Sequence, residues 1–184
     1  MFTKRINKDL SLALIQPAFA KQYAALVTTQ TAYLAQWLAW PKHCHTEQHF
    51  REFAQKMLHD YADGTSMTCS ILYKGEIVGN CSFNRIDHSR KMVEVGYWLS
   101  CHHQGKGIMT QVVSKLIDIA FNELQMEKVQ LAAAENNTPS RNLAKRVGMS
   151  LEGIITHAEN INGQILNHAI YGIHKQSYIA NANR

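Results

Sequence analysis

The sequence lacks any long apolar run, and its four cysteines show no C-x-x-C or zinc-ligand spacing. Because a helix needs about 20 apolar residues to cross a bilayer, we predict no membrane partner. The charged N-terminal residues include no apolar core of the kind that a secretory signal requires. We therefore expect a cytoplasmic protein without a metal site. Cys69 and Cys81 fall in predicted strands and could face each other, but the cytosol keeps thiols reduced.

The sequence also has no lysine- or arginine-rich run and no alternation of aromatic and basic residues. These absences argue against a nucleic-acid-binding module and against DNA as a partner. The formal net charge of +5 favours acidic partners instead. With 46% hydrophobic and 18% charged residues, the chain has the composition of an ordinary globular protein. Its length predicts a single domain over residues 1–184.

Short segments of apolar residues, separated by turn residues, predict strands, and segments of longer period predict helices. The predicted strands cover residues 10–14, 69–73, 77–83, 93–99, 129–133, 154–161 and 165–173. The predicted helices cover residues 18–37 with a break near 28–31, 46–64, 107–124 and 139–147. A meander followed by β-α-β units predicts an α/β fold with a mixed, mostly antiparallel sheet of about seven strands and helices on both faces.

The most informative segment joins the strand that ends in Gly96-Tyr-Trp-Leu99 to the helix that begins near Gly107. A glycine-rich turn before a helix exposes backbone N–H groups at the positive end of the helix dipole, and this arrangement binds phosphate. Gly105 and Gly107 let an anion approach the backbone, and Lys106 adds charge. The dinucleotide pattern fails because Thr110 replaces its third glycine. The nucleotide P-loop fails because no glycine precedes Gly105 at the required spacing.

The phrase Gln104-Gly-Lys-Gly-Ile-Met109 resembles the acetyl-coenzyme A pyrophosphate loop of the GNAT superfamily of N-acetyltransferases. Met109 departs from the small residue that is usual at the last position. The ending Gly-Lys-Gly-Ile-Met-Thr is similar to the branch that acetylates serine in ribosomal proteins. The resemblance implies that acetyl-coenzyme A binds through one strand end and this loop, which comprise Tyr97, Trp98, Leu99, Gln104, Gly105, Lys106, Gly107, Ile108, Met109 and Thr110.

Three further phrases match the same family. Asn137-Thr-Pro-Ser140 opens a helix, and the resemblance implies that the Asn137 amide contacts coenzyme A. From the residues alone, Asn137 or Thr138 also caps that helix. Glu159-Asn-Ile-Asn-Gly163 matches a turn of the branch and carries the Asn-Gly signal of a β-hairpin. The phrase Leu34–Pro41, with two tryptophans that we interpret as core anchors, matches a segment after the first helix.

Acetyl transfer from a thioester needs a neutral amine, stabilisation of the oxyanion and a proton for the leaving thiolate. Many members of the superfamily supply that proton from a tyrosine, but Ala144 occupies the matching position. The resemblance to stalk-protein serine acetyltransferases implies Ser140 as the acid and Glu159 as the base. Glu94 is the second candidate for the base. Backbone N–H groups at residues 97–99 are expected to polarise the thioester carbonyl.

Other chemistry is less well supported by the residues. Cys101 beside the loop would allow a covalent acetyl-enzyme, but no base partner for it is visible. His43, His45 and His49 lie around a helix start without a matching set of carboxylates or cysteines, so no metal is predicted there.

The pKa of the acceptor amine narrows the choice of acceptor. An α-amine with a pKa near 8 is about one-tenth neutral at pH 7, whereas a lysine near 10.4 leaves only a few parts in ten thousand neutral. One carboxylate could therefore suffice for an α-amine. The resemblance implies that the acceptor is the N-terminal serine of an acidic ribosomal stalk protein. It also makes a homodimer a candidate for the oligomeric state. The alternatives are a small amine, such as a polyamine, amino sugar or antibiotic, and a non-catalytic ribosome- or RNA-binding module.

Overall fold

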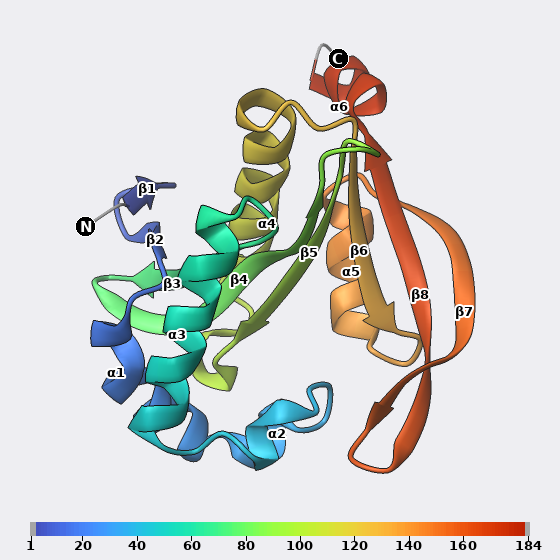
Figure 1. Cartoon of the computed structure of the whole chain (residues 1–184). Helices are drawn as coiled ribbons and strands as arrows, with labels where there is room; N and C mark the ends of the chain where they lie inside the picture. The colour runs from blue at the N-terminus through green and yellow to red at the C-terminus, as the bar shows by residue number, and fades with distance from the viewer. Residues whose placement is uncertain (1–2, 183–184) are drawn as a thin grey trace. The chain divides into compact units, whose positions relative to one another are not determined.

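A computed structural model describes residues 3–182, whose helices and strands are labelled in Figure 1. The strands are β1 (Thr3–Arg5), β2 (Leu10–Leu14), β3 (Met67–Tyr73), β4 (Glu76–Asp87), β5 (Met92–Leu99), β6 (Lys128–Ala134), β7 (Ser150–Ile161) and β8 (Gln164–His174). The α-helices are α1 (Ala20–Thr28), α2 (Thr31–Leu34), α3 (Glu47–Ala62), α4 (Ile108–Asp118), α5 (Thr138–Arg146) and α6 (Lys175–Ala182). Single turns η1 (Pro17–Phe19), η2 (Trp40–Lys42), η3 (Cys101–His103) and η4 (Ile119–Glu123) complete the described chain.

The strands form one sheet in the order β1-β2-β3-β4-β5-β6-β8-β7. Strand β5 pairs with β6 in parallel, whereas β1–β2, β2–β3, β6–β8 and β7–β8 are antiparallel. The predicted α/β class with a mixed, mostly antiparallel sheet is confirmed. The described residues contain eight strands where about seven were expected. The extra strand is β1, whose three residues Thr-Lys-Arg carry no apolar alternation.

The chain folds into two compact units. The first unit comprises the described residues up to Ser82 together with Tyr97–Ile108. The second unit comprises Phe83–Gly96 and the described residues from Met109 onward. The chain thus passes from one unit to the other within β4, within β5 and in the first turn of α4.

The core of the first unit gathers around Tyr23 of α1. Its ring stacks on Phe50 at 5.6 Å between centroids and meets Trp98 edge-on at 5.9 Å. The Tyr23 hydroxyl donates a hydrogen bond to Ser70 Oγ at 2.7 Å and accepts one from Asn80 Nδ2 at 3.2 Å. Burial raises the pKa of Tyr23, so the hydroxyl stays neutral. A buried polar group whose bonds are all made costs little stability and fixes the packing around it.

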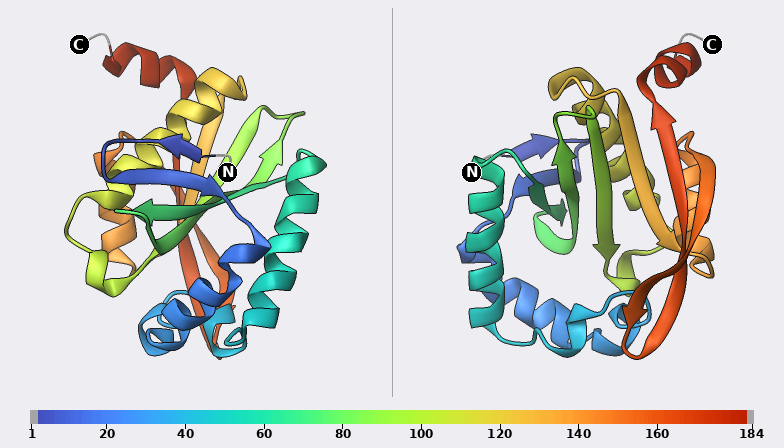
Figure 2. Two further views of the ribbon diagram at one scale, coloured as in Figure 1. Left: turned by 90° about the vertical axis from the view of Figure 1, so that its left-hand side faces the viewer. Right: turned by 45° about the vertical axis from the view of Figure 1, so that its right-hand side comes forward.

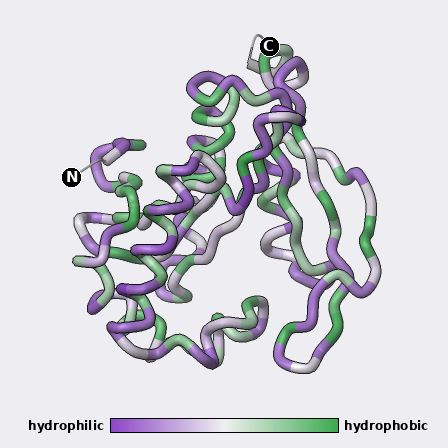
Figure 3. Tube along the Cα trace, in the orientation of Figure 1, coloured by the Kyte–Doolittle hydropathy of each residue, from purple (hydrophilic) through white to green (hydrophobic). Residues whose placement is uncertain are grey.

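Helix α3 begins and ends where the sequence predicts. The Thr46 hydroxyl accepts a hydrogen bond from the His49 N–H at 3.2 Å, which is an N-cap. The chain leaves the helix through Gly64, whose φ is +69°. Figure 3 shows hydrophilic and hydrophobic residues alternating along α3. Phe50 is buried, but Phe53 is 39% exposed, so the large apolar side chains of α3 are only partly buried.

Two cysteines lie inside the first unit, Cys69 in β3 and Cys81 in β4. Both are free thiols and both are buried. Burial raises the pKa of Cys69 to about 12 and that of Cys81 well above its usual value. Both therefore stay protonated at neutral pH. The other two cysteines, Cys44 and Cys101, are free and half-buried.

The second unit is built on α4, β6 and the β7–β8 hairpin. Helix α4 buries a wide face, and the predicted helix to residue 124 continues past Asp118 as the π turn η4. The hairpin turns at Asn162 and Gly163, which have φ values of +55° and +93°, as the Asn-Gly signal predicts. Figure 2 shows this long hairpin twisting along its length. Nearly every residue of β7 is exposed, because β7 is the last strand of the sheet.

The close approach of β4 to the end of β5 depends on Gly79. A Cβ at position 79 would lie 2.3 Å from the Trp98 carbonyl oxygen and 3.1 Å from Leu99 Cα. Both are backbone atoms, which cannot rotate away. We expect Gly79→Ala to lower the free energy of unfolding by about 1–3 kcal/mol, measured by urea denaturation. Gly153→Ala is the control, because a Cβ there meets nothing within 4 Å. Equal effects of the two changes would contradict this account.

Candidate acetyltransferase site

The predicted phosphate loop follows β5 in the first unit. After β5 ends, the turn η3 leads into the exposed residues 104–107, and α4 begins at Ile108. Gly105 and Gly107 have φ values of +74° and +70°. This left-handed conformation is strained for residues other than glycine. A Cβ at position 105 would meet no atom within 4 Å, so the turn is open to solvent.

Two backbone amides of this loop are available to a ligand. Within the described residues 3–182, neither the Gly105 nor the Lys106 N–H donates to a protein acceptor. Helix α4 starts directly after the loop, which adds the positive end of its dipole. Exposed N–H groups, two small residues and a helix start together fit a phosphate group.

The charge of the loop comes from Lys106. Its Nζ lies 5.9 Å from the centroid of the Tyr73 ring, and the His103 ring meets the same ring edge-on at 5.9 Å. Burial, together with Lys106 and His102, lowers the pKa of His103. His103 is therefore neutral at pH 7, so it adds no positive charge at physiological pH.

At the strand end before the loop, the Trp98 side chain is taken up by core packing. The Trp98 ring packs at 5.9 Å from both Tyr23 and Trp40, inside the first unit. Trp40 is thus a core anchor, as the sequence predicts. The parallel pairing of β5 with β6 ends at Val95 and Leu131. The predicted carbonyl-polarising segment, residues 97–99, begins two residues later.

The first turn of α4 carries three further predicted donor-binding residues. Ile108 is 2% exposed, so only its backbone can meet a ligand. Met109 and Thr110 are half-buried and belong to the second unit. The Thr110 Oγ1 accepts a hydrogen bond from Arg146 Nη1 at 3.1 Å, which joins the start of α4 to the end of α5.

Asn137 caps α5 in the second unit. Its Oδ1 accepts a hydrogen bond from the Ser140 N–H at 3.2 Å, so Asn137 rather than Thr138 is the N-cap. Its Nδ2 makes no hydrogen bond with any residue in the described part of the chain. Capping therefore leaves the amide nitrogen free to donate to a ligand. This is consistent with both roles that the sequence suggests for Asn137.

Ser140 lies in the first turn of α5 and is half-buried. Its Oγ has no hydrogen-bond partner within residues 3–182. One turn later, Ala144 is 0% exposed. A larger side chain at position 144 would enter the packed interior. The first turn of α5 thus offers two hydroxyls, the exposed one of Thr138 and the half-buried one of Ser140, and position 144 offers none.

Glu159 lies at an irregularity of the β7–β8 hairpin. The register shifts between Ile155 and Glu159, and His157 within the shift has a φ of +52°. The Asn167 side chain accepts a hydrogen bond from the His157 N–H at 3.1 Å, which replaces a lost ladder bond. Glu159 Oε2 lies 3.2 Å from His168 Nε2, and the Glu159 side chain is 44% exposed. Bulges of this kind re-aim side chains and recur beside active sites.

Glu94, the second candidate base, lies in the part of β5 that pairs with β6. It is the register partner of Gln130, whose Nε2 lies 3.4 Å from Glu94 Oε2. Its carboxylate is therefore engaged within the sheet. Glu159 has the more accessible carboxylate of the two.

The predicted site residues fall into two groups. The first unit holds Tyr97, Trp98, Leu99, Gln104, Gly105, Lys106, Gly107 and Ile108, and the second holds Glu94, Met109, Thr110, Asn137, Ser140 and Glu159. No group of three or more His, Cys, Asp or Glu side chains suited to a metal ion occurs among residues 3–182. Within the same residues no helix has the length and apolar character to span a bilayer.

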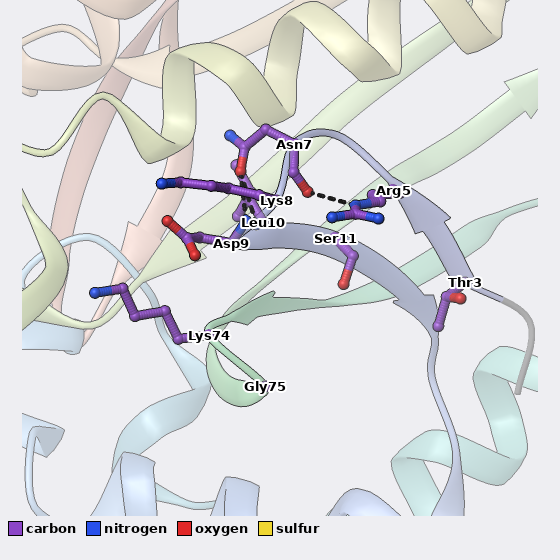
Figure 4. Close-up of a pocket in the computed structure, with 9 residues that line it drawn as sticks. All are labelled: Thr3, Arg5, Asn7, Lys8, Asp9, Leu10, Ser11, Lys74 and Gly75. Atoms are coloured by element: carbon purple, nitrogen blue, oxygen red, sulfur yellow. Dashed lines mark hydrogen bonds between the residues drawn. The ribbon is translucent and has the colours of Figure 1, made fainter.

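A polar pocket of about 270 Å³ lies elsewhere on the first unit. Its lining comes from β1, β2 and their connection and from the β3–β4 turn: Thr3, Arg5, Asn7, Lys8, Asp9, Leu10, Ser11, Lys74 and Gly75. Figure 4 shows the Asp9 carboxylate between the Lys8 and Lys74 side chains. None of the predicted site residues lines this pocket.

Comparison with known proteins identifies the family. Residues 10–150 match the family of acetyltransferase (GNAT) domains. The chain belongs to this family. It is an acetyltransferase of the GNAT type, related to ribosomal-protein acetyltransferases, and the predicted fold and enzyme class are confirmed.

Relatives of this acetyltransferase match it over almost its whole length. "Putative ribosomal N-acetyltransferase YdaF" of Bacillus subtilis (strain 168) is 30% identical over 179 residues, which cover 97% of this chain and 98% of YdaF. The ribosomal-protein-serine acetyltransferase of Escherichia coli (strain K12) is 29% identical over 160 residues, which cover 87% of this chain and 89% of that enzyme. Among solved structures, RimL, a ribosomal L7/L12 alpha-N-protein acetyltransferase in complex with coenzyme A, has a TM-score of 0.91 at 25% identity. The match covers 96% of this chain and 99% of RimL.

Several residues that support the site carry no sequence signal. His168 faces Glu159, and Asn167 fills the gap in the hairpin ladder. Both lie in a strand whose alternation predicts only its pairing. Their role depends on the register shift in β7, which no residue pattern announces. Gln30 and Tyr33, which contact the segment around the phosphate loop, were likewise not predicted.

Proposed function

We propose that this acetyltransferase transfers the acetyl group of acetyl-coenzyme A to the N-terminal serine α-amine of an acidic ribosomal stalk protein. The observation that carries the proposal is the open loop Gln104–Gly107, with its left-handed glycines and with amides at Gly105 and Lys106 that have no acceptor within residues 3–182. The names of the relatives support a ribosomal-protein acceptor. The net charge of +5 favours an acidic one. We further propose that both units act as one catalytic domain over residues 1–184.

In this proposal the loop and the first turn of α4 hold the diphosphate of the donor. The amides of Gly105 and Lys106 donate to phosphate oxygens, and the Lys106 ammonium balances their charge. The Asn137 side chain also donates a hydrogen bond to acetyl-coenzyme A. It uses its Nδ2, because its Oδ1 is already engaged in the cap. The strand end at residues 97–99 supplies N–H groups to the thioester carbonyl, where negative charge develops.

The chemistry falls to two residues of the second unit. The acceptor nitrogen loses a proton to the Glu159 carboxylate and attacks the carbonyl carbon, forming the C–N bond. The C–S bond then breaks, and the leaving sulfur takes a proton from Ser140 Oγ, which water reprotonates. His168, whose Nε2 lies 3.2 Å from Glu159 Oε2, holds that carboxylate in place. An α-amine suits this arrangement, because about one-tenth of it is already neutral at pH 7 and one carboxylate can accept the proton that it loses on attack.

An acceptor competition tests the proposal. The enzyme is incubated with labelled acetyl-coenzyme A and either intact stalk protein or a small amine such as spermidine or an amino sugar. We expect label on the stalk protein, located on its N-terminal serine by mass spectrometry. The matched control is the same stalk protein with its N-terminus already acetylated, which should take up no label. Label confined to the small amines would show that the acceptor is a small amine and not a protein. Absence of thiol release with every amine would point to a non-catalytic binding module.

A further inference from the structure

Gln30 stands between α1 and α2 and is a buried polar residue that the proposed chemistry does not use. It is 6% exposed and lies at the N-cap position of α2, yet its side chain makes no capping bond there. Instead the side chain crosses to the segment before the phosphate loop. Both elements belong to the first unit.

The Gln30 amide makes two hydrogen bonds to the start of η3. Its Oε1 accepts from the Cys101 N–H at 2.8 Å, and its Nε2 donates to Ser100 Oγ at 3.1 Å. Cys101 is the first residue of η3, and the first N–H groups of a helical turn have no partner inside that turn. Ser100 precedes η3 but makes no side-chain cap. Gln30 therefore supplies, from 71 residues away, the cap that the local sequence lacks.

Tyr33 holds the other end of the same turn. It follows Gln30 by three residues, and its hydroxyl accepts a hydrogen bond from Gln104 Nε2. The pKa of Tyr33 is raised mainly by burial and further by the nearby Cys101, so the phenol remains neutral. Leu34, the next residue, is 4% exposed in the core of the first unit. The α1–α2 junction is thus anchored in the core, and it hydrogen-bonds to both ends of η3.

We infer that Gln30 is a positioning residue for the diphosphate of the donor, acting through η3 on the loop Gln104–Gly107. The inference rests on the proposed function, which assigns that loop to the diphosphate. The Gly105 and Lys106 amides can bind phosphate only if η3 holds the loop in a fixed position. A displacement of about 1 Å can lower activity on the order of a hundredfold. Removing the Gln30 amide leaves the Cys101 N–H and the Ser100 hydroxyl without their partner, so the turn is expected to shift.

The test compares two donors in Gln30→Met, which keeps the length of the side chain and removes both bonds. One donor is acetyl-coenzyme A, and the other is S-acetyl-pantetheine, which has the same thioester but no diphosphate. We expect kcat/KM for acetyl-coenzyme A to fall by about tenfold or more, with the KM of the acceptor unchanged. With S-acetyl-pantetheine the variant and the unmodified enzyme should match. A merely structural role would lower the rates with both donors equally, and that result would overturn the inference.

Two further variants keep the inference testable if Gln30→Met folds poorly. Ser100→Ala removes one bond of the Gln30 amide, and Tyr33→Phe removes the contact with Gln104. Each is expected to show the same donor-specific loss in smaller measure. Gln22→Met on the exposed face of α1 is the matched control and should change nothing.

Unmodified enzyme that binds no coenzyme A in calorimetry would remove the proposed function itself. Normal binding by the unmodified enzyme and by all three variants would overturn only the role of Gln30.

Discussion

Gly107→Glu should abolish binding of coenzyme A, with a loss in affinity of more than about a hundredfold. Gly107 has a φ of +70° in an exposed turn, so any side chain strains the backbone there. Glutamate also places a carboxylate where the proposal puts the diphosphate, and like charges at close range repel strongly. Isothermal calorimetry with coenzyme A measures the effect directly.

The control for this change is Gly163→Glu in the β7–β8 turn. Gly163 has a φ of +93°, and a Cβ there would meet nothing within 4 Å. The control therefore carries the same added charge and a comparable backbone strain at a different turn. We expect it to keep its affinity for coenzyme A. If Gly107→Glu folds and binds as well as the unmodified enzyme, the diphosphate does not lie on this loop.

Ser140→Ala should lower kcat by about a hundredfold or more while the affinity for coenzyme A changes less than about twofold. The substitution removes the hydroxyl that we assign to the leaving thiolate. It keeps the backbone N–H that donates to Asn137 Oδ1 at 3.2 Å, so the cap of α5 survives. Steady-state kinetics with saturating donor and acceptor, alongside calorimetry, separate the chemical step from binding.

Thr138→Ala provides the comparison within the same first turn. Thr138 is exposed and also carries a hydroxyl, but the proposal gives it no part in the reaction. Its kcat should match that of the unmodified enzyme. Full turnover in Ser140→Ala would remove Ser140 from the mechanism and direct attention to another proton donor.

The loop and the caps could be predicted because their signals are local. Gly105 and Gly107 need left-handed backbone, Thr46 and Asn137 cap helices by contacts three residues away, and Asn162-Gly163 specifies a tight hairpin turn. In each case the residue type and the geometry are linked within a few positions. These are the features that one sequence can establish by itself.

The parts that were missed depend on distant residues. Strand β1 has no apolar alternation and is assigned only because it pairs with β2. The contact of Gln30 with Cys101 joins residues 71 positions apart, and a glutamine between two helices reads as a surface residue. Glu159 lies beside a register shift in β7, which the composition of the strand does not reveal.

The buried cysteines have a practical consequence for measuring turnover. The Cys69 and Cys81 thiols are shielded and remain protonated, so they are poor nucleophiles toward disulfide reagents. Such reagents report free coenzyme A by a colour change. In the folded enzyme the background of that assay comes from Cys44 and Cys101 alone, and a sudden rise in it would signal unfolding rather than catalysis.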